Sequence, residues 1–249
     1  MVTHYIFMSS DYVGGTRIAL DVTDEELLKV PVLDGILRKI RAECGEDVAL
    51  STHMLATDSV DWSSVVKYDP FFAGVACVDS VEAFSARIKK SRVLSGLGVA
   101  NYILSKVRCT HLSLEKLTYF AYADYLCSTL RRLFEDHIYA FTYGPVVESV
   151  YDAYKRSGYD YVEPLRDNFL HLGIGEMPAK SRILFAHDGT EKLDSIKRTI
   201  DRYGGCTAQE LVDLTHRPGS PWSSVDSHLP YQIIPDDVIR ERHHVERLP

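Results

Sequence analysis

The amino-acid sequence predicts an α+β fold that is predominantly helical, in which a small N-terminal α+β unit precedes a mainly helical domain. Two short apolar segments that begin at Tyr5 and Arg17 stand on either side of Gly14-Gly15, as two strands joined by a turn do. Helical spacing of apolar residues dominates the later part of the chain. Because two glycines loosen the pattern just after residue 95, we place a domain boundary between residues 1–95 and 96–249.

The N-terminal unit contains signals for helices and for a buried strand. Thr23-Asp24-Glu25-Glu26 has the form of a capping box, and it predicts a helix that Pro31 interrupts or restarts and that Gly45 ends. The apolar run Phe71–Val78 is typical of a buried strand. Asp79 with Glu82 then predicts the start of another helix, which completes the expected α+β unit.

The later part of the chain predicts a set of helices around a central one. A helix is expected over Val99–Val107, and Ser113 is a suitable N-cap for a second helix that reaches about Leu130. Because this second helix carries apolar residues on nearly all sides, we expect it in the centre of the domain. His137–Tyr143 is expected to be a short strand or an extended segment.

The tripeptide Tyr143-Gly144-Pro145 predicts a sharp turn. We expect Gly144 to occupy a positive φ or a tight position where a side chain would clash. Pro145, with its fixed φ, is expected to open a helix over Val146–Lys155. The polar and aromatic stretch Tyr159–Met177 receives no assignment.

Further helices are predicted toward the C-terminus. Asp188 with Glu191 predicts the start of a helix that ends at Gly204-Gly205, and Thr207-Ala208-Gln209-Glu210 is a second capping box. A short helix is expected from Pro235, and the charged tail Arg240–Arg247 is expected to be solvated or frayed.

Composition limits the classes of function. The formal net charge of −7 and an isoelectric point near 5.8 give no electrostatic footprint for nucleic acid or anionic lipid, so neither is expected as a partner. The sequence has no run of roughly 18 apolar residues and no basic leader, so neither membrane insertion nor secretion is expected. Five cysteines without metal-ligand spacing predict reduced thiols in the cytoplasm: Cys44, Cys77, Cys109, Cys127 and Cys206.

Three stretches of sequence, in the same order, carry a family resemblance. The first is Val99–Leu104 followed by Leu112–Ala121, the second is Tyr143–Val147 with Val150-Tyr151 and Lys155, and the third is Glu210–His216 with Pro221-Trp222. Together they resemble the Panacea domain, which is also known from SocA-like and phage-associated proteins. The candidates for interaction that this resemblance gives are Lys116, Tyr119, Phe120, Tyr143, Gly144, Pro145, Tyr151, Thr215, His216 and Trp222.

The resemblance implies a cytoplasmic antitoxin that neutralises an unrelated, often translation-blocking protein toxin by binding it directly. Some relatives instead present a toxin to a Clp-type protease, so an adaptor for such a protease is the alternative. Residues 1–95 lie outside the resemblance, and we expect them to add affinity or to choose the partner. Fifteen tyrosines suit a binding module, since tyrosine gives a large amphipathic contact area at a modest entropic cost.

Catalysis, a cofactor and a bound metal are not expected. An enzyme with a site around Glu115, Lys116 and His216 is a third hypothesis, but we expect an exposed glutamate and a snorkelling lysine. No second histidine or cysteine stands at ligand spacing from His216, and no serine or cysteine motif supplies a nucleophile. We therefore expect Thr215 and His216 to bond backbone groups at a helix end and Trp222 to fill the core.

The remaining polar pairs have structural explanations. His243 and His244 lie next to each other in the charged tail, and adjacent residues do not share one helix face, so metal binding is not expected there. The carboxylate pairs Asp58 with Asp61 and Asp236 with Asp237 resemble helix starts, where the helix dipole favours negative charge.

Overall fold

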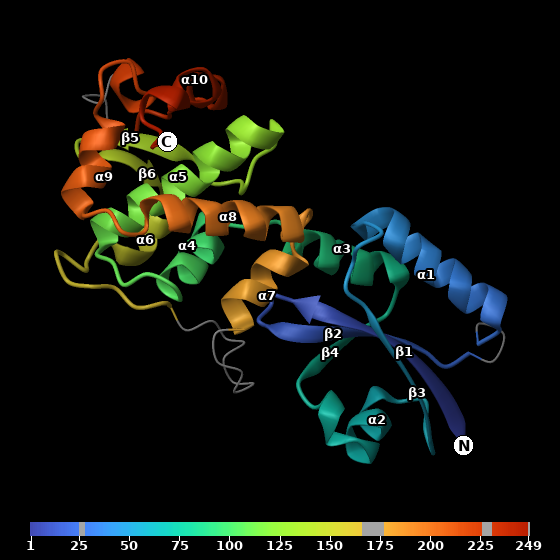
Figure 1. The fold of residues 1–249 in the computed structure, drawn as a ribbon. Helices are drawn as coiled ribbons and strands as arrows, with labels where there is room; N and C mark the ends of the chain where they lie inside the picture. Colours follow the sequence, from blue (N-terminus) through green and yellow to red (C-terminus); the bar gives the residue numbers. More distant parts are fainter. Residues whose placement is uncertain (25–27, 166–176, 226–230, 249) are drawn as a thin grey trace. The chain divides into compact units, whose positions relative to one another are not determined.

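The computed structural model describes residues 1–24, 28–165, 177–225 and 231–248 (Figure 1). The fold is α+β and mostly helical, as the sequence predicts. The chain divides into two compact units, of which the first contains residues 1–93 and the second begins at Leu94. Each unit has its own hydrophobic core, and each is described below by itself.

The N-terminal unit is built on a four-stranded sheet in the order β3-β1-β2-β4. Its strands are β1 (Val2–Asp11), β2 (Thr16–Val22), β3 (Ser51–Thr57) and β4 (Val75–Val78). The predicted pair of strands around Gly14-Gly15 is confirmed as the antiparallel hairpin β1-β2, and Gly15 has a φ of 65° that suits glycine. Strand β3 pairs with β1 in antiparallel fashion and β4 with β2 in parallel fashion.

Helices cover both faces of this sheet. Figure 1 shows α1 (Val30–Cys44) and α3 (Val81–Ser91) on one side and α2 (Trp62–Tyr68) on the other. The alternation of side chains along β1 explains this, because Ile6 and Met8 point into a cluster with Val65 of α2 while Phe7 is buried on the opposite face.

Several predicted details of this unit differ from the structure. The run Phe71–Val78 is not one strand, because a 3-10 helix, η1 (Pro70–Phe72), and a positive φ of 75° at Gly74 precede β4. Pro31 lies in the first turn of α1, where a missing N–H costs no hydrogen bond, so it does not interrupt the helix. The N-cap of α3 is Ser80, whose hydroxyl accepts a hydrogen bond from Ala83 N. Part of the predicted capping box at Thr23 lies outside the described residues.

The C-terminal unit surrounds one long helix, α5 (His111–Thr129), which is buried over most of its length. The prediction of a central helix that is apolar on nearly all sides is confirmed. Its N-cap is Thr110 rather than Ser113, because the Thr110 side chain accepts from Ser113 N. The elements that pack against α5 are α4 (Gly96–Leu104), α6 (Glu148–Tyr154), α8 (Gly189–Tyr203), α9 (Ala208–Thr215), α10 (Asp236–Arg242) and a hairpin strand.

The hairpin consists of β5 (Ile138–Phe141) and β6 (Gly144–Val147). The expectation for Gly144 is confirmed, since its φ is +100°. The prediction that Pro145 opens a helix is wrong, because Pro145 lies in β6 and α6 begins at Glu148. Proline has no backbone N–H to donate, but its carbonyl oxygen is used in the strand, where it accepts a hydrogen bond from Lys116 of α5.

The last elements complete the helical layer. Helix α7 (Met177–Phe185) packs against α4 and α8, and the capping box at Thr207 and Glu210 is present at the start of α9. The expectation of a solvated tail is wrong, because His243 and Glu246 are buried and bonded to α5. In the described part of the chain, none of the helices has the length and apolarity that crossing a membrane requires.

Candidate protein-binding surface

Lys116 is fully buried near the middle of α5, and its ammonium group holds the hairpin. Lys116 Nζ donates a hydrogen bond to the carbonyl oxygen of Pro145 at 2.7 Å. Burial lowers the pKa of Lys116 to about 8, although the carboxylates of Glu115 and Glu246 act in the opposite direction. The predicted snorkelling lysine is therefore wrong, because a backbone carbonyl of the hairpin replaces water as the partner of the ammonium group.

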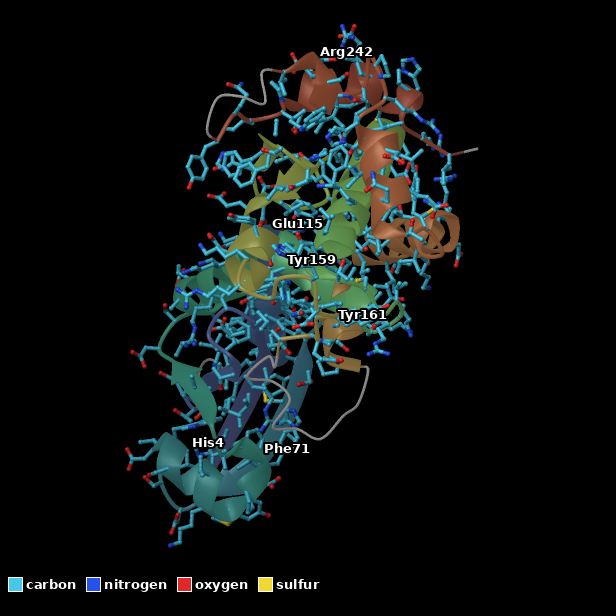
Figure 2. All side chains as sticks on the ribbon, turned by 90° about the vertical axis from the view of Figure 1, so that its left-hand side faces the viewer. His4, Phe71, Glu115, Tyr159, Tyr161 and Arg242 are labelled. Atoms are coloured by element: carbon cyan, nitrogen blue, oxygen red, sulfur yellow. The ribbon has the colours of Figure 1, made fainter. Side chains whose placement is uncertain are left out.

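Glu115 supports the same hairpin from the neighbouring position on α5 (Figure 2). Its Oε2 accepts a hydrogen bond from Val147 N at 2.8 Å, and its Oε1 lies 3.1 Å from His111 Nε2. Burial raises the pKa of Glu115, while these two hydrogen bonds lower it. The predicted exposed glutamate is wrong for the same reason as the predicted lysine, since the hairpin covers this face of α5.

Gly144 is the point where the three sequence motifs meet. A Cβ atom at this position would lie 2.7 Å from Thr215 Oγ1 and 2.9 Å from Lys116 Cε. The first motif thus supplies Lys116, the second supplies Gly144 and the third supplies Thr215. Only glycine fits between the other two side chains at the observed φ.

His216 and Trp222 fix the opposite side of the hairpin. The Trp222 Nε1 donates to the carbonyl oxygen of Phe141 at 2.8 Å, and the rings of His216 and Trp222 lie with their centroids 3.7 Å apart. As predicted, Thr215 and His216 satisfy a backbone group at a helix end, since both side chains lie 2.8 Å from Val212 O. Trp222 differs from the prediction, because it is half-buried at the border of the core rather than inside it.

Four aromatic rings on and beside the hairpin pack together, and we call them the aromatic surface: Tyr139, Phe141, Tyr151 and Tyr231. The first three are partly exposed. Tyr231 packs edge to face on both Tyr139 and Phe141, with centroid distances of 5.7 and 5.8 Å. Its side chain is 68% exposed. Backbone hydrogen bonds from Ala140 N to Gln232 O and from Ile234 N to Ile138 O, each 2.8 Å, join this segment to β5 and hold the surface in shape.

Carboxylates border the aromatic surface. Tyr139 donates a hydrogen bond from its hydroxyl to Glu148 Oε1 at 3.3 Å, and Glu148 Oε2 lies 3.1 Å from His137 Nδ1. Asp152 follows one turn later on α6 and pairs with Lys155 at 2.7 Å. Limited burial and the charges of Glu148 and Asp152 raise the pKa of the Tyr139 hydroxyl.

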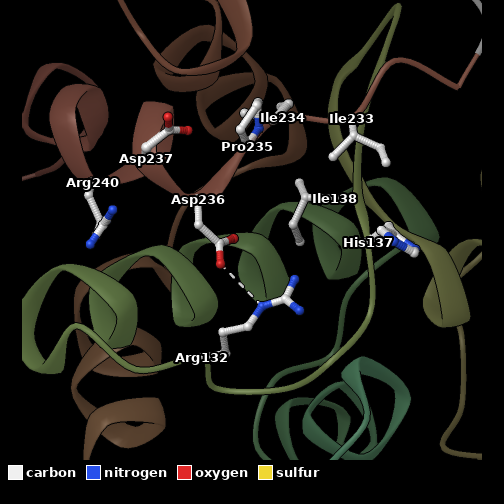
Figure 3. Close-up of a pocket in the computed structure, with 9 residues that line it drawn as sticks. All are labelled: Arg132, His137, Ile138, Ile233, Ile234, Pro235, Asp236, Asp237 and Arg240. Carbon is white, nitrogen blue, oxygen red and sulfur yellow. Dashed lines mark ion pairs between the residues drawn. The ribbon is translucent and has the colours of Figure 1, made fainter.

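A cleft of about 440 Å³ adjoins this surface, and its lining includes His137, Ile138 and Ile233 (Figure 3). Its wall includes an ion pair between Arg132 Nε and Asp236 Oδ2 at 3.2 Å. The predicted role of Asp236 at a helix start is only part of its structure, because its other oxygen accepts from Tyr122 OH at 2.7 Å. The cleft thus combines an isoleucine lining with charged groups.

The C-terminal segment joins α5 through buried polar groups. Tyr119 OH donates to Glu246 Oε1 at 2.5 Å, and His243 bridges Glu246 and Asp124 through its two ring nitrogens. Burial acts to lower the pKa of His243, but hydrogen bonds to the two carboxylates raise it above its usual value. Of the resemblance candidates, Tyr119 and Phe120 are therefore interior groups, whereas Tyr143 is 67% exposed in the turn between β5 and β6.

One row of side chains in the N-terminal unit has the order of a catalytic triad. His4 Nδ1 lies 2.7 Å from Asp21 Oδ2, and His4 Nε2 lies 2.9 Å from Thr57 Oγ1. Thr57 is buried, and its hydroxyl already donates to Ser59 O at 2.7 Å. This row therefore has the character of a structural network that joins β1, β2 and β3. Among the described residues there is also no cluster of three or more histidine, cysteine or acidic side chains that could hold a metal ion.

Exposed aromatic rings on a fixed hairpin are typical of a protein-interaction module. Residues 114–223 match the family model described as "Antitoxin SocA-like, Panacea domain", so this part of the chain is similar to the SocA-like Panacea family, as the motif resemblance predicted. A relative named "Antitoxin SocA", from Caulobacter vibrioides, is 28% identical over 134 residues, which are 51% of this chain and 68% of the relative. The chain shows no significant match to a solved structure.

Sequence reasoning missed most of the aromatic surface. It selected Tyr143 and Tyr151 through the motif, but not Tyr139, Phe141 or Tyr231. The spacing of Tyr139 and Phe141 two residues apart in an expected strand was a usable signal, because such residues share one face. No local pattern linked Tyr231 to them, since it lies far along the chain and meets them only through tertiary pairing.

Proposed function

We propose that this chain is an antitoxin that neutralises a protein toxin by binding it directly. The observation that carries the proposal is the match of residues 114–223 to the SocA-like Panacea family. The structure supports binding rather than catalysis, because the polar motif residues Lys116 and Thr215 are buried and bonded to backbone groups. A buried group that supports a hairpin has no access to a substrate.

The test of this proposal is rescue of growth. The product of a small open reading frame beside the gene is expressed from one promoter and this chain from another. We expect growth arrest by the first protein alone, recovery when both are made, and a stable complex in size-exclusion chromatography. Recovery without a complex would contradict direct binding, and recovery that is lost in a host without Clp proteases would identify a protease adaptor.

We further propose that the N-terminal unit contributes to the choice of partner, while the C-terminal unit binds the toxin. The N-terminal unit has a separate core around Ile6, Val65 and Phe72, so its surface can vary without disturbing the helical unit. A fragment of residues 94–249 is expected to unfold cooperatively and to keep part of the toxin affinity. Full neutralisation by a fragment of residues 1–93 would place the function in the other unit.

A further inference from the structure

We propose that the aromatic surface is the docking face for the toxin and that it receives an arginine-bearing segment of that protein. The inference rests on the proposed antitoxin function and adds the place and the chemistry of the contact. Its basis is the combination of exposed and partly exposed rings on and beside the hairpin with the bordering carboxylates of α6.

The rings are placed to receive a cation. A guanidinium group binds over the face of a tyrosine or phenylalanine ring, and a nearby carboxylate strengthens the contact. The chain contains an internal example of this arrangement, because Lys155 Nζ lies 5.7 Å from the centroid of Tyr151 while it pairs with Asp152. Tyr231 offers a ring that is more exposed than that of Tyr151.

The bordering charges favour a basic partner. Glu148 already contacts Tyr139 and His137, yet its side chain remains 45% exposed, and that of Asp152 is 64% exposed. Both carboxylates lie on α6, four residues apart and therefore on one face of the helix. The net charge of −7 adds a long-range attraction for a basic protein.

The surface is also rigid enough to bind without a large ordering cost. The backbone bonds of β5 to β6 and to the segment at Gln232 fix the rings from both sides. Lys116, Glu115 and Trp222 fix the hairpin to the helical core. Preorganisation of this kind lowers the entropy lost on association.

The test uses the full chain and two defined peptides, acetyl-Gly-Arg-Gly-Arg-Gly-amide and its glutamate counterpart. NMR titration with isotope-labelled tyrosine and phenylalanine follows the rings. We expect the arginine peptide to shift the resonances of Tyr139 and Tyr231, with weaker binding at high salt, and the glutamate peptide to leave them unchanged. Equal shifts with both peptides, or no shift at these rings, would overturn the proposed chemistry.

Matched variants identify the groups involved. Tyr231→Asn removes the exposed ring, and asparagine tolerates the left-handed φ of 55° at this position. Its control is Tyr159→Asn, because Tyr159 is 97% exposed and makes none of the ring contacts found in the described part of the chain (Figure 2). The double variant Glu148→Gln with Asp152→Asn is compared with Asp160→Asn. We expect about a fivefold loss of affinity for the arginine peptide in the first variant of each comparison and none in its control.

The same variants in the growth assay separate the two proposals. If the unmodified chain neutralises the toxin and Tyr231→Asn loses neutralisation while Tyr159→Asn keeps it, the docking face is supported. If all variants neutralise equally, the docking proposal is wrong and the antitoxin proposal stands. If the unmodified chain fails to neutralise but the arginine peptide binds as expected, the antitoxin proposal fails and the cation preference of the surface stands.

Discussion

Replacement of Gly144 by alanine is expected to destabilise the C-terminal unit through both its backbone conformation and its contacts. A φ of +100° costs a residue with a side chain about 1–2 kcal/mol, by analogy with the left-handed region. The new methyl group would also lie 2.7 Å from Thr215 Oγ1 and 2.9 Å from Lys116 Cε, which forces an overpacked core at about 1–3 kcal/mol. The expected loss in the free energy of unfolding is therefore about 2–5 kcal/mol.

The control for this experiment is Gly158→Ala. Gly158 also has a positive φ, of +59°, but a Cβ there would meet no atom within 4 Å, so the expected loss is about 1–2 kcal/mol. Urea unfolding is followed by tryptophan fluorescence in a Trp62→Phe background, so that Trp222 alone reports on the C-terminal unit. An equal loss in the two variants would show that contact with Lys116 and Thr215 is not what requires glycine at position 144.

Three further changes have expected outcomes. Trp222→Ala removes a half-buried ring and its bond to Phe141 O, and is expected to cost about 2–3 kcal/mol in thermal unfolding followed by circular dichroism. Lys116→Met removes a group whose pKa falls to about 8 on folding. Between pH 8 and 10.5 the unfolded natural chain therefore binds more protons than the folded natural chain. The free energy of unfolding of the natural chain, relative to that of the variant, is expected to rise over that range by up to about 3 kcal/mol. His243→Asn removes a histidine whose pKa is raised on folding, so its cost is expected to be larger at pH 6 than at pH 9.

Each of these changes has a result that would contradict its reasoning. A cost of Trp222→Ala near zero would mean that the ring does not hold the hairpin. A stability difference for Lys116→Met that does not rise between pH 8 and 10.5 would mean that the buried amine is not forced toward its neutral form. A cost of His243→Asn that is independent of pH would mean that the two carboxylates do not stabilise the imidazolium.

The sequence was sufficient where the signal is local. The capping box at Thr207 and Glu210, the helix end at Gly45 and the special backbone at Gly144 were all predicted from a few adjacent residues, and all are present. The central position of α5 was predicted from its apolar residues on nearly all sides. In these cases the physical cause, whether a cap, a positive φ or an apolar surface, lies in the segment itself.

Local signals failed where the partner of a residue lies far away in sequence. Glu115 and Lys116 look like surface charges in a helix, and only the hairpin at Pro145 and Val147 makes their burial possible. His243 and Glu246 look like part of a charged tail, and only Asp124 and Tyr119 on α5 explain why they are buried. A charged residue in an otherwise apolar helix therefore indicates a tertiary partner as well as a solvated position.

Lys116, Gly144 and Thr215 are needed together because each occupies space that the other two leave, so they fix the position of the hairpin. In our proposal, the residues that contact a partner are the rings on and beside that hairpin, such as Tyr139 and Tyr231, which the motifs do not specify. In this chain those residues are aromatic and bordered by Glu148 and Asp152, which favours a partner that presents arginine.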